Sequence, residues 1–184
     1  MKFAGLILAI GFHFAEAAQE DRLTAETITE AIGRLANSKP YIPEYVYNVI
    51  LAMDSETKTE LAQLCNDYFD GKIETPKNIE ELMTMLNADY SLVASTFAKI
   101  NIFYRQRLGN LGPKSREFLN NVERRLFDAA NNDTGKLRDN LATAIEQAQS
   151  DFRQLYDDDD EATKLDEQFP QFRNIYNSLE KIAA

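Results

Sequence analysis

The 184-residue sequence predicts an all-α protein, and three observations lead to this fold class. Apolar residues recur at intervals of three and four, as they do along one face of a helix. The alternation of apolar and polar residues that is typical of half-buried strands is missing. Glycine is scarce, with seven residues in the whole chain. Because the length suits one domain, we expect a single compact domain of many short and medium amphipathic helices.

Turn and capping residues set the expected boundaries of these helices. Lys39-Pro40 is expected to end the first helix, Pro43 to begin the second, and Asp54 to cap the third. Asp54, Gly112 and Asp160 introduce similar segments, which predicts shared capping chemistry at three helix starts. The expected helices cover residues 25–36, 43–53, 55–69, 79–86, 89–108, 113–130 and 136–156, followed by a short helix that ends near Phe169 and a last helix from about Phe172 to Ile182.

The first residues have the pattern of a secretory signal peptide. Lys2 supplies a positive charge, an apolar run extends from Phe3 to Phe14, and Ala15-Glu16-Ala17 provides small residues at the usual cleavage spacing. The run is shorter than the roughly 20 apolar residues that a membrane anchor needs. We therefore expect residues 1–17 to be a signal peptide that is cleaved after Ala17 or Ala18, and residues 18–184 to be a secreted helical domain.

The rarest residue types limit the chemistry of the mature chain. His13 is the only histidine and lies in the expected signal peptide, so the usual Ser-His-Asp and Cys-His triads and histidine-bound zinc are excluded. Cys65 is the only cysteine, so no internal disulfide can form. Because Cys65 lies on an apolar helical stripe, we interpret it as a small core residue and not as a reactive thiol. We expect no catalysis and no cofactor.

The acidic run from Asp157 to Glu161 invites a calcium-binding interpretation. An EF-hand loop needs glycine at its sixth position and glutamate at its twelfth. Counted from Asp157, these positions hold Ala162 and Gln168. The pattern therefore fails, and we interpret the run as a solvated turn that is rich in N-capping residues, with no metal site.

The charge of the chain is unevenly distributed. The net charge is −10 and the isoelectric point is about 4.7, which makes nucleic acid a poor partner. Between Lys99 and Arg125, however, seven basic residues stand against two acidic ones. Lys99, Arg105 and Arg107 lie beside an apolar stripe, where they are candidates for contact with a ligand carboxylate or, alternatively, with an anionic membrane surface. The plainer alternative is a solvated basic face that pairs with the acidic remainder.

Two further features concern the surface and the core. Asn132-Asp133-Thr134 is an acceptor sequence for N-glycosylation in an expected turn. The 11 phenylalanines and 8 tyrosines lie on helix faces, where such residues usually fill a core. Many short helices separated by prolines pack less regularly than a few long ones, which favours an internal apolar cavity. The candidate lining residues share the apolar stripes of three helices: Phe97, Ile100, Phe103, Phe118, Val122, Leu141, Ile145 and Phe152.

Four segments together resemble the nematode fatty-acid- and retinol-binding protein family. These are a proline-led helix start at Tyr41–Val46, a capped start at Met53–Lys58, a turn and helix at Leu111–Phe118, and a turn at Phe169–Phe172. Their order and spacing match that family from about Tyr41 to the end of the chain. The resemblance implies a secreted helical carrier with an internal cavity for fatty acids and retinol, and no catalysis.

One alternative from a different class remains open at this point. A secreted helical protein with a filled core could instead bind a host protein or a second protein of the same organism. It would show an exposed apolar patch and no ligand cavity.

Overall fold

The computed structural model describes residues 22–132 and 136–183, and this part of the chain contains nine α-helices, one 3-10 helix and no strand. The elements in chain order are α2 (Ala25–Arg34), η1 (Leu35–Tyr41), α3 (Glu44–Leu51), α4 (Ser55–Phe69), α5 (Ile79–Asp89), α6 (Ser91–Leu108), α7 (Pro113–Asn131), α8 (Leu137–Tyr156), α9 (Asp159–Gln168) and α10 (Gln171–Ala183). The predicted all-α fold is confirmed.

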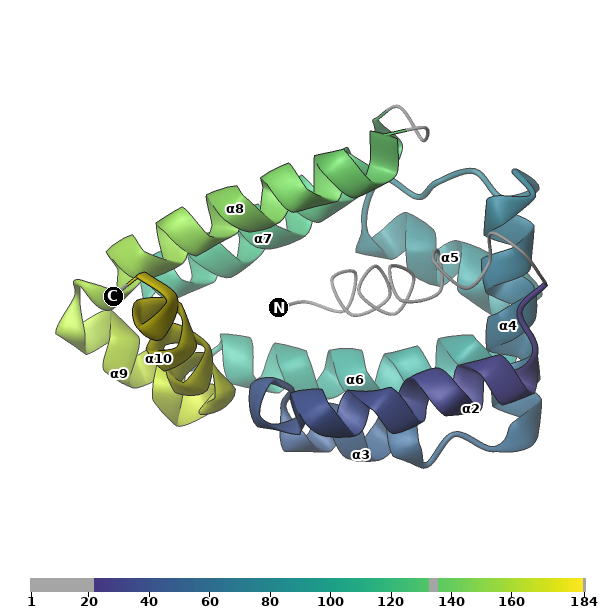
Figure 1. Cartoon of the computed structure of the whole chain (residues 1–184), viewed down its shortest axis with the longest axis horizontal. Helices are drawn as coiled ribbons and strands as arrows, with labels where there is room; N and C mark the ends of the chain where they lie inside the picture. Colours follow the sequence, from purple (N-terminus) through teal and green to yellow (C-terminus); the bar gives the residue numbers. More distant parts are fainter. Residues whose placement is uncertain (1–21, 133–135, 184) are drawn as a thin grey trace.

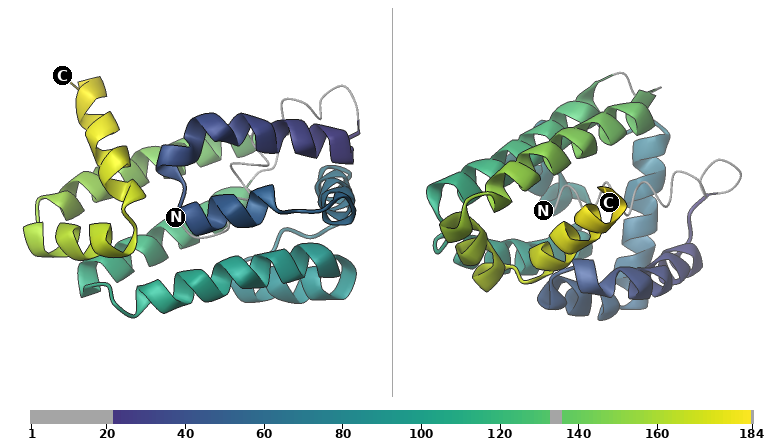
Figure 2. Two further views of the ribbon diagram at one scale, coloured as in Figure 1. Left: turned by 90° about the horizontal axis from the view of Figure 1, so that it is seen from below. Right: turned by 60° about the vertical axis from the view of Figure 1, so that its left-hand side comes forward.

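The helices form two layers that are joined at both ends. In one layer α3 lies alongside α6, with α2 on the far side of α3 (Figure 2), and in the other α7 and α8 form an antiparallel hairpin (Figure 1). The helices α4 and α5 lie at one end of the molecule, and α9 and α10 lie at the other (Figure 1). The long helices α6 and α7 follow one another in the chain and belong to opposite layers.

The last helix returns to the beginning of the described chain. The hydroxyls of Tyr41 in η1 and Ser178 in α10 lie 3.1 Å apart, and the Asn174 amide donates to the Pro40 carbonyl over 2.8 Å. The far end of α10 extends away from the body of the molecule (Figure 2). The contact between η1 and α10 therefore closes the circuit of helices.

Two predicted boundaries differ from those in the structure. Lys39-Pro40 was expected to end the first helix, but α2 ends at Arg34 and the chain continues as the 3-10 helix η1, which has Pro40 inside it. Proline fixes φ near the value that a 3-10 helix needs. A 3-10 helix is also commonly used in short pieces of this kind. The helix α5 extends to Asp89, and only Tyr90 separates it from α6. The extended φ of −139° at Tyr90 interrupts the helix there.

Several helices begin with a cap from their own sequence. Asp54 accepts a hydrogen bond from the Thr57 amide at 2.8 Å, as predicted for the start of α4. Thr24 and Asn78 cap α2 and α5 in the same way. The prediction of shared capping chemistry was wrong at the other two starts. Asp158, and not Asp160, caps α9, and Gly112 at the start of α7 has no side chain to offer.

The two long central helices instead receive their caps from other helices. Glu60 of α4 accepts a hydrogen bond from the Val93 amide in the first turn of α6, at 2.7 Å. Glu161 of α9 accepts from the Ser115 amide at 3.0 Å and from the Ser115 hydroxyl at 2.8 Å, in the first turn of α7. The first amides of a helix carry a partial positive charge and lack partners within the helix, so both carboxylates satisfy them.

Glu161 is a buried carboxylate, which corrects the prediction for this residue; Asp157, Asp159 and Asp160 are exposed, as expected for a solvated turn. Its side chain is 5% exposed and Ser115 is fully buried. Burial by itself raises the pKa of Glu161, but hydrogen bonds from the Ser115 hydroxyl and from the Ser115 and Lys114 amides outweigh it. The pKa of Glu161 therefore lies below its ordinary value, and the group is ionised at neutral pH.

The glycine at position 112 follows from the same contact. Its φ of −68° is open to any residue, so backbone freedom does not explain it. A Cβ atom at this position would instead fall on the carboxylate of Glu161. Glycine is favoured at this position because the capping carboxylate occupies the space that a side chain would need.

We expect Gly112→Ala to lower the free energy of unfolding by about 1–3 kcal/mol, because the added methyl group displaces the carboxylate from the start of α7. Gly33→Ala is the matched control, since a Cβ there meets nothing within 4 Å. In the helix α2, alanine should stabilise by up to about 1 kcal/mol. Urea denaturation monitored by circular dichroism measures both, and equal effects of the two substitutions would contradict the role of Glu161.

We expect Glu161→Gln to lower the free energy of unfolding at pH 7 by about 1–3 kcal/mol, as charge-assisted hydrogen bonds are lost. Because the folded pKa is depressed, this contribution is present above the ordinary value of 4.5 and disappears as the pH falls through the folded pKa. The difference between wild type and variant should therefore narrow below that pH. Glu167→Gln, at an exposed position of the same helix, is the control and should have little effect at any pH.

Candidate functional site

The apolar interior of the described chain is divided into two clusters. The amino-terminal cluster is built from residues of α2 to α6 together with Phe127 of α7. The carboxy-terminal cluster extends from Tyr104, near the end of α6, to Phe172 of α10. Only α6 and α7 contribute buried residues to both clusters. The boundary between the clusters therefore lies along these two helices.

One face of α6 carries the apolar residues that reach this boundary. Val93, Phe97, Ile100 and Tyr104 follow one another at intervals of three and four, and each is at most 7% exposed. The first three belong to the amino-terminal cluster and Tyr104 to the carboxy-terminal one. Burial raises the pKa of the Tyr104 phenol, and the charge of Glu123 raises it further.

The carboxy-terminal cluster is rich in aromatic rings that centre on Phe152. Its ring centroid lies 5.6 Å from that of Phe118, 4.7 Å from Tyr156, 5.4 Å from Phe172 and 6.3 Å from Tyr176. These rings come from α7, α8 and α10, so one side chain of α8 connects three helices. Offset and edge-to-face contacts of this kind stabilise beyond the area that they bury.

The structure divides the eight predicted lining residues between the two clusters. Phe97, Ile100 and the partly buried Phe103 belong to the amino-terminal cluster. The carboxy-terminal cluster contains Phe118, Val122, Leu141 and Phe152. Seven of the eight therefore lie in the apolar interior. A single cavity between them remains a prediction.

The eighth residue, Ile145, lies on the outer side of α8 and is 48% exposed. The sequence pattern places Ile145 four residues after Leu141, on the same stripe. In the structure the buried positions are instead Leu141, Ala144 and Phe152, with Ala148 packed against them. This spacing of three, four and four turns Ile145 toward solvent.

Of the three basic residues predicted to contact a ligand or a membrane, one packs against neighbouring groups and two are exposed. The Arg107 guanidinium lies 3.7 Å from the centroid of the Phe103 ring, and its Nε donates to the Gln168 carbonyl at 3.0 Å. Lys99 and Arg105 are exposed, and neither forms an ion pair with any residue of the described ranges. Of the three basic residues, Arg107 therefore lies where α6 meets the end of α9.

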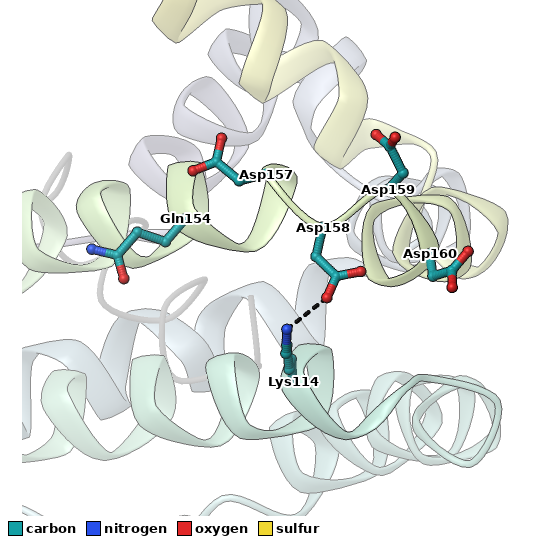
Figure 3. Close-up of a pocket in the computed structure, with 6 residues that line it drawn as sticks. All are labelled: Lys114, Gln154, Asp157, Asp158, Asp159 and Asp160. Carbon is teal, nitrogen blue, oxygen red and sulfur yellow. Dashed lines mark hydrogen bonds and ion pairs between the residues drawn. The ribbon is translucent and has the colours of Figure 1, made fainter.

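The acidic run borders a hollow at the surface. Lys114, Gln154 and Asp157–Asp160 line an open hollow of about 530 Å³ between α7, the end of α8 and the start of α9 (Figure 3). Lys114 forms an ion pair of 2.6 Å with Asp158. Their hydrogen bond is the largest influence on both groups, and it lowers the pKa of Asp158 and raises that of Lys114. A polar lining is unsuited to an acyl chain. Among the described residues, no cluster of three potential metal ligands occurs.

Two further residues singled out in the sequence are Asn132, the candidate glycosylation site, and Cys65, the single cysteine. Asn132 is exposed directly after α7, and Asp133 and Thr134 of the acceptor sequence lie outside the described residues, as do residues 1–17. Cys65 is partly buried against the amino-terminal cluster, and burial raises the pKa of its thiol to about 12. A thiol with such a pKa is almost wholly protonated at neutral pH and therefore weakly nucleophilic.

Sequence reasoning missed the two carboxylates that position the central helices. Glu60 lies 33 residues before its partner Val93, and Glu161 lies 46 residues after Ser115. No local pattern marks a glutamate that caps a distant helix. The available signal was indirect, since α6 and α7 begin without a capping side chain of their own.

The comparison with protein families identifies the chain. Residues 36–183 match the family model described as nematode fatty acid retinoid binding protein (Gp-FAR-1). The chain belongs to this family. The match begins in η1 and includes the carboxy-terminal cluster, the part of the amino-terminal cluster that follows α2, the helices α6 and α7, and the contact between η1 and α10. The resemblance seen in the sequence is thus confirmed over most of the chain. No curated protein and no solved structure matches the chain significantly.

Membership of this family supports a protein that binds fatty acids and retinoids, and the family is one of carriers rather than enzymes. Within the described residues, none of the helices has the length and apolar character to cross a bilayer.

We expect Phe152→Ala to lower the free energy of unfolding by about 3–5 kcal/mol, because its ring joins α7, α8 and α10. Ile145→Ala, on the same helix but half exposed, should cost less than about 1 kcal/mol. Thermal and urea unfolding provide the measurement. Similar losses of stability at the two positions would show that Ile145 is also buried in the core, and would contradict its placement on the outer side of α8.

Proposed function

We propose that the chain is a secreted carrier that binds one fatty acid or retinol molecule between its two apolar clusters and transfers it to an acceptor. The division of the interior along α6 and α7, in a member of this family, is the observation that carries the proposal. Residues 1–17 act as the signal peptide in this proposal, and Asn132 is its N-glycosylation site. The protein has no catalytic role and uses no cofactor.

Burial of the acyl chain supplies the free energy of binding. At about 0.8 kcal/mol per methylene group, enclosing a long chain contributes on the order of 10 kcal/mol. The loss of translational and rotational freedom offsets several of these. The remainder corresponds to a dissociation constant in roughly the micromolar to submicromolar range.

The proposed binding region lies between the apolar faces of α6 and α7. Phe97 and Ile100 form one wall, and Phe118, Val122 and Phe152 form the other. Arg107 lies at the end of α6 where the two clusters meet, and we assign the contact with the ligand carboxylate to it. An arginine suits this role because its fixed fork of donors matches a carboxylate.

The absence of tryptophan from the sequence allows a direct test. We expect single tryptophans at Phe97→Trp and Phe152→Trp to be strongly quenched by a fatty acid brominated along its chain, which quenches only at close range. Phe69→Trp, 41% exposed on α4, is the matched control and should be quenched little. Oleate and retinol should each reverse the quenching by competition.

Failure of the brominated fatty acid to quench either interior tryptophan, together with no binding of oleate or retinol by the wild-type chain, would overturn the proposal. The alternative of a secreted interaction protein with a filled core would then take its place. Quenching at Phe97→Trp alone would place the ligand within the amino-terminal cluster and contradict binding between the two clusters.

A further inference from the structure

The helix α6 differs in charge from every other α-helix in the described chain. Each of the other eight α-helices contains at least one aspartate or glutamate, and α6 contains none. Its charged residues are Lys99, Arg105 and Arg107, in a chain with a net charge of −10. The outer side of α6 is therefore a basic site on an acidic molecule.

The exposed face of α6 also carries the most exposed large apolar side chain among the described residues. Ile102 is 59% exposed, and Lys99 and Arg105 lie three residues before and after it. Residues at this spacing are neighbours on a helix surface. Leu92, nearer the start of α6, is 39% exposed. Basic and apolar side chains thus alternate along a helix face that no acidic residue of α6 neutralises.

The neighbouring helix α3 extends this face. The Tyr45 ring stacks on Phe103 with centroids 4.4 Å apart, and its hydroxyl donates to the Lys99 carbonyl at 3.4 Å. Tyr45 is 38% exposed and Leu51 of the same helix 47%. Four of the seven exposed large apolar residues in the described chain therefore lie on α3 and α6, which run side by side (Figure 2).

We propose that this face of α3 and α6 docks on the surface of an anionic lipid membrane. Lysine, arginine, tyrosine and exposed aliphatic residues are the side chains that bind at the headgroup level of a bilayer. Basic residues near such a surface are attracted by about 1 kcal/mol each. Most of the remaining helices carry acidic residues, which the same surface repels, and this favours an orientation with the α6 face toward the membrane.

The position of this face relates docking to ligand transfer, and this part rests on the proposed carrier function. Phe97 and Ile100 of the amino-terminal cluster lie on the inner side of α6, opposite Ile102. A docked molecule would hold the proposed binding region about one helix diameter, roughly 10 Å, from the lipid headgroups. Docking itself requires no bound ligand.

Flotation with vesicles tests the proposal. We expect the full mature chain to bind vesicles of phosphatidylcholine and phosphatidylserine at low salt, and to bind vesicles of phosphatidylcholine alone much more weakly. Lys99→Glu/Arg105→Glu should weaken binding to the anionic vesicles about tenfold or more. Ile102→Gln should weaken it severalfold, and high salt should weaken binding of the wild type through screening.

A charge-matched variant controls for repulsion by the whole molecule. Arg116→Glu/Arg124→Glu changes the net charge equally at exposed positions of α7, in the opposite layer (Figure 1). This variant should bind anionic vesicles within about threefold of the wild type. Equal losses in the two double variants, or no preference of the wild type for anionic vesicles, would overturn the proposal.

Two further measurements separate this proposal from others. Titration of oleate in solution should give the same affinity for wild type and Lys99→Glu/Arg105→Glu, so failure of oleate binding would count against the carrier function and leave docking standing. Analytical ultracentrifugation of Ile102→Gln tests for a second copy on this face. Dissociation of a wild-type dimer by this substitution, with vesicle binding unchanged, would assign the face to self-association and contradict membrane docking.

Discussion

The buried carboxylate of Glu161 at the start of α7 is the contact on which the carboxy-terminal half of the molecule depends. A buried charge is costly unless its hydrogen bonds are satisfied, and Ser115 together with the first amides of α7 satisfies them. The same contact explains the glycine at position 112. Glu60 has the corresponding role at the start of α6. Both long helices are thus fixed by residues of other helices.

This arrangement separates two tasks within the protein. The apolar residues of α6 and α7 form the boundary between the clusters, where they can contact an apolar ligand. The charged groups that orient these helices come from α4 and α9 and lie at the starts of α6 and α7. Substitution of an apolar residue in the walls would therefore leave these two capping contacts in place.

The sequence was informative at several positions where the cause of a structure is local. The cap at Asp54 and the helices on either side of the Gly109–Gly112 turn follow from neighbouring residues, and the structure confirms them. The burial of Glu161 could not be predicted, since its partner Ser115 lies 46 residues away. Ile145 was assigned to the wrong side of α8, because Ala144 completes the stripe equally well in sequence and only packing decides between them.

The contact between η1 and α10 has a consequence for biosynthesis. Its two hydrogen bonds join residues that are 134 and 137 positions apart, which is most of the described chain. The helix α10 leaves the ribosome after the other described helices, so the amino-terminal cluster can assemble in the nascent polypeptide while the circuit of helices is still open. Closure must wait until α10 has been synthesised, and a chain that stops before Gln171 would leave Tyr41 and Pro40 without their partners.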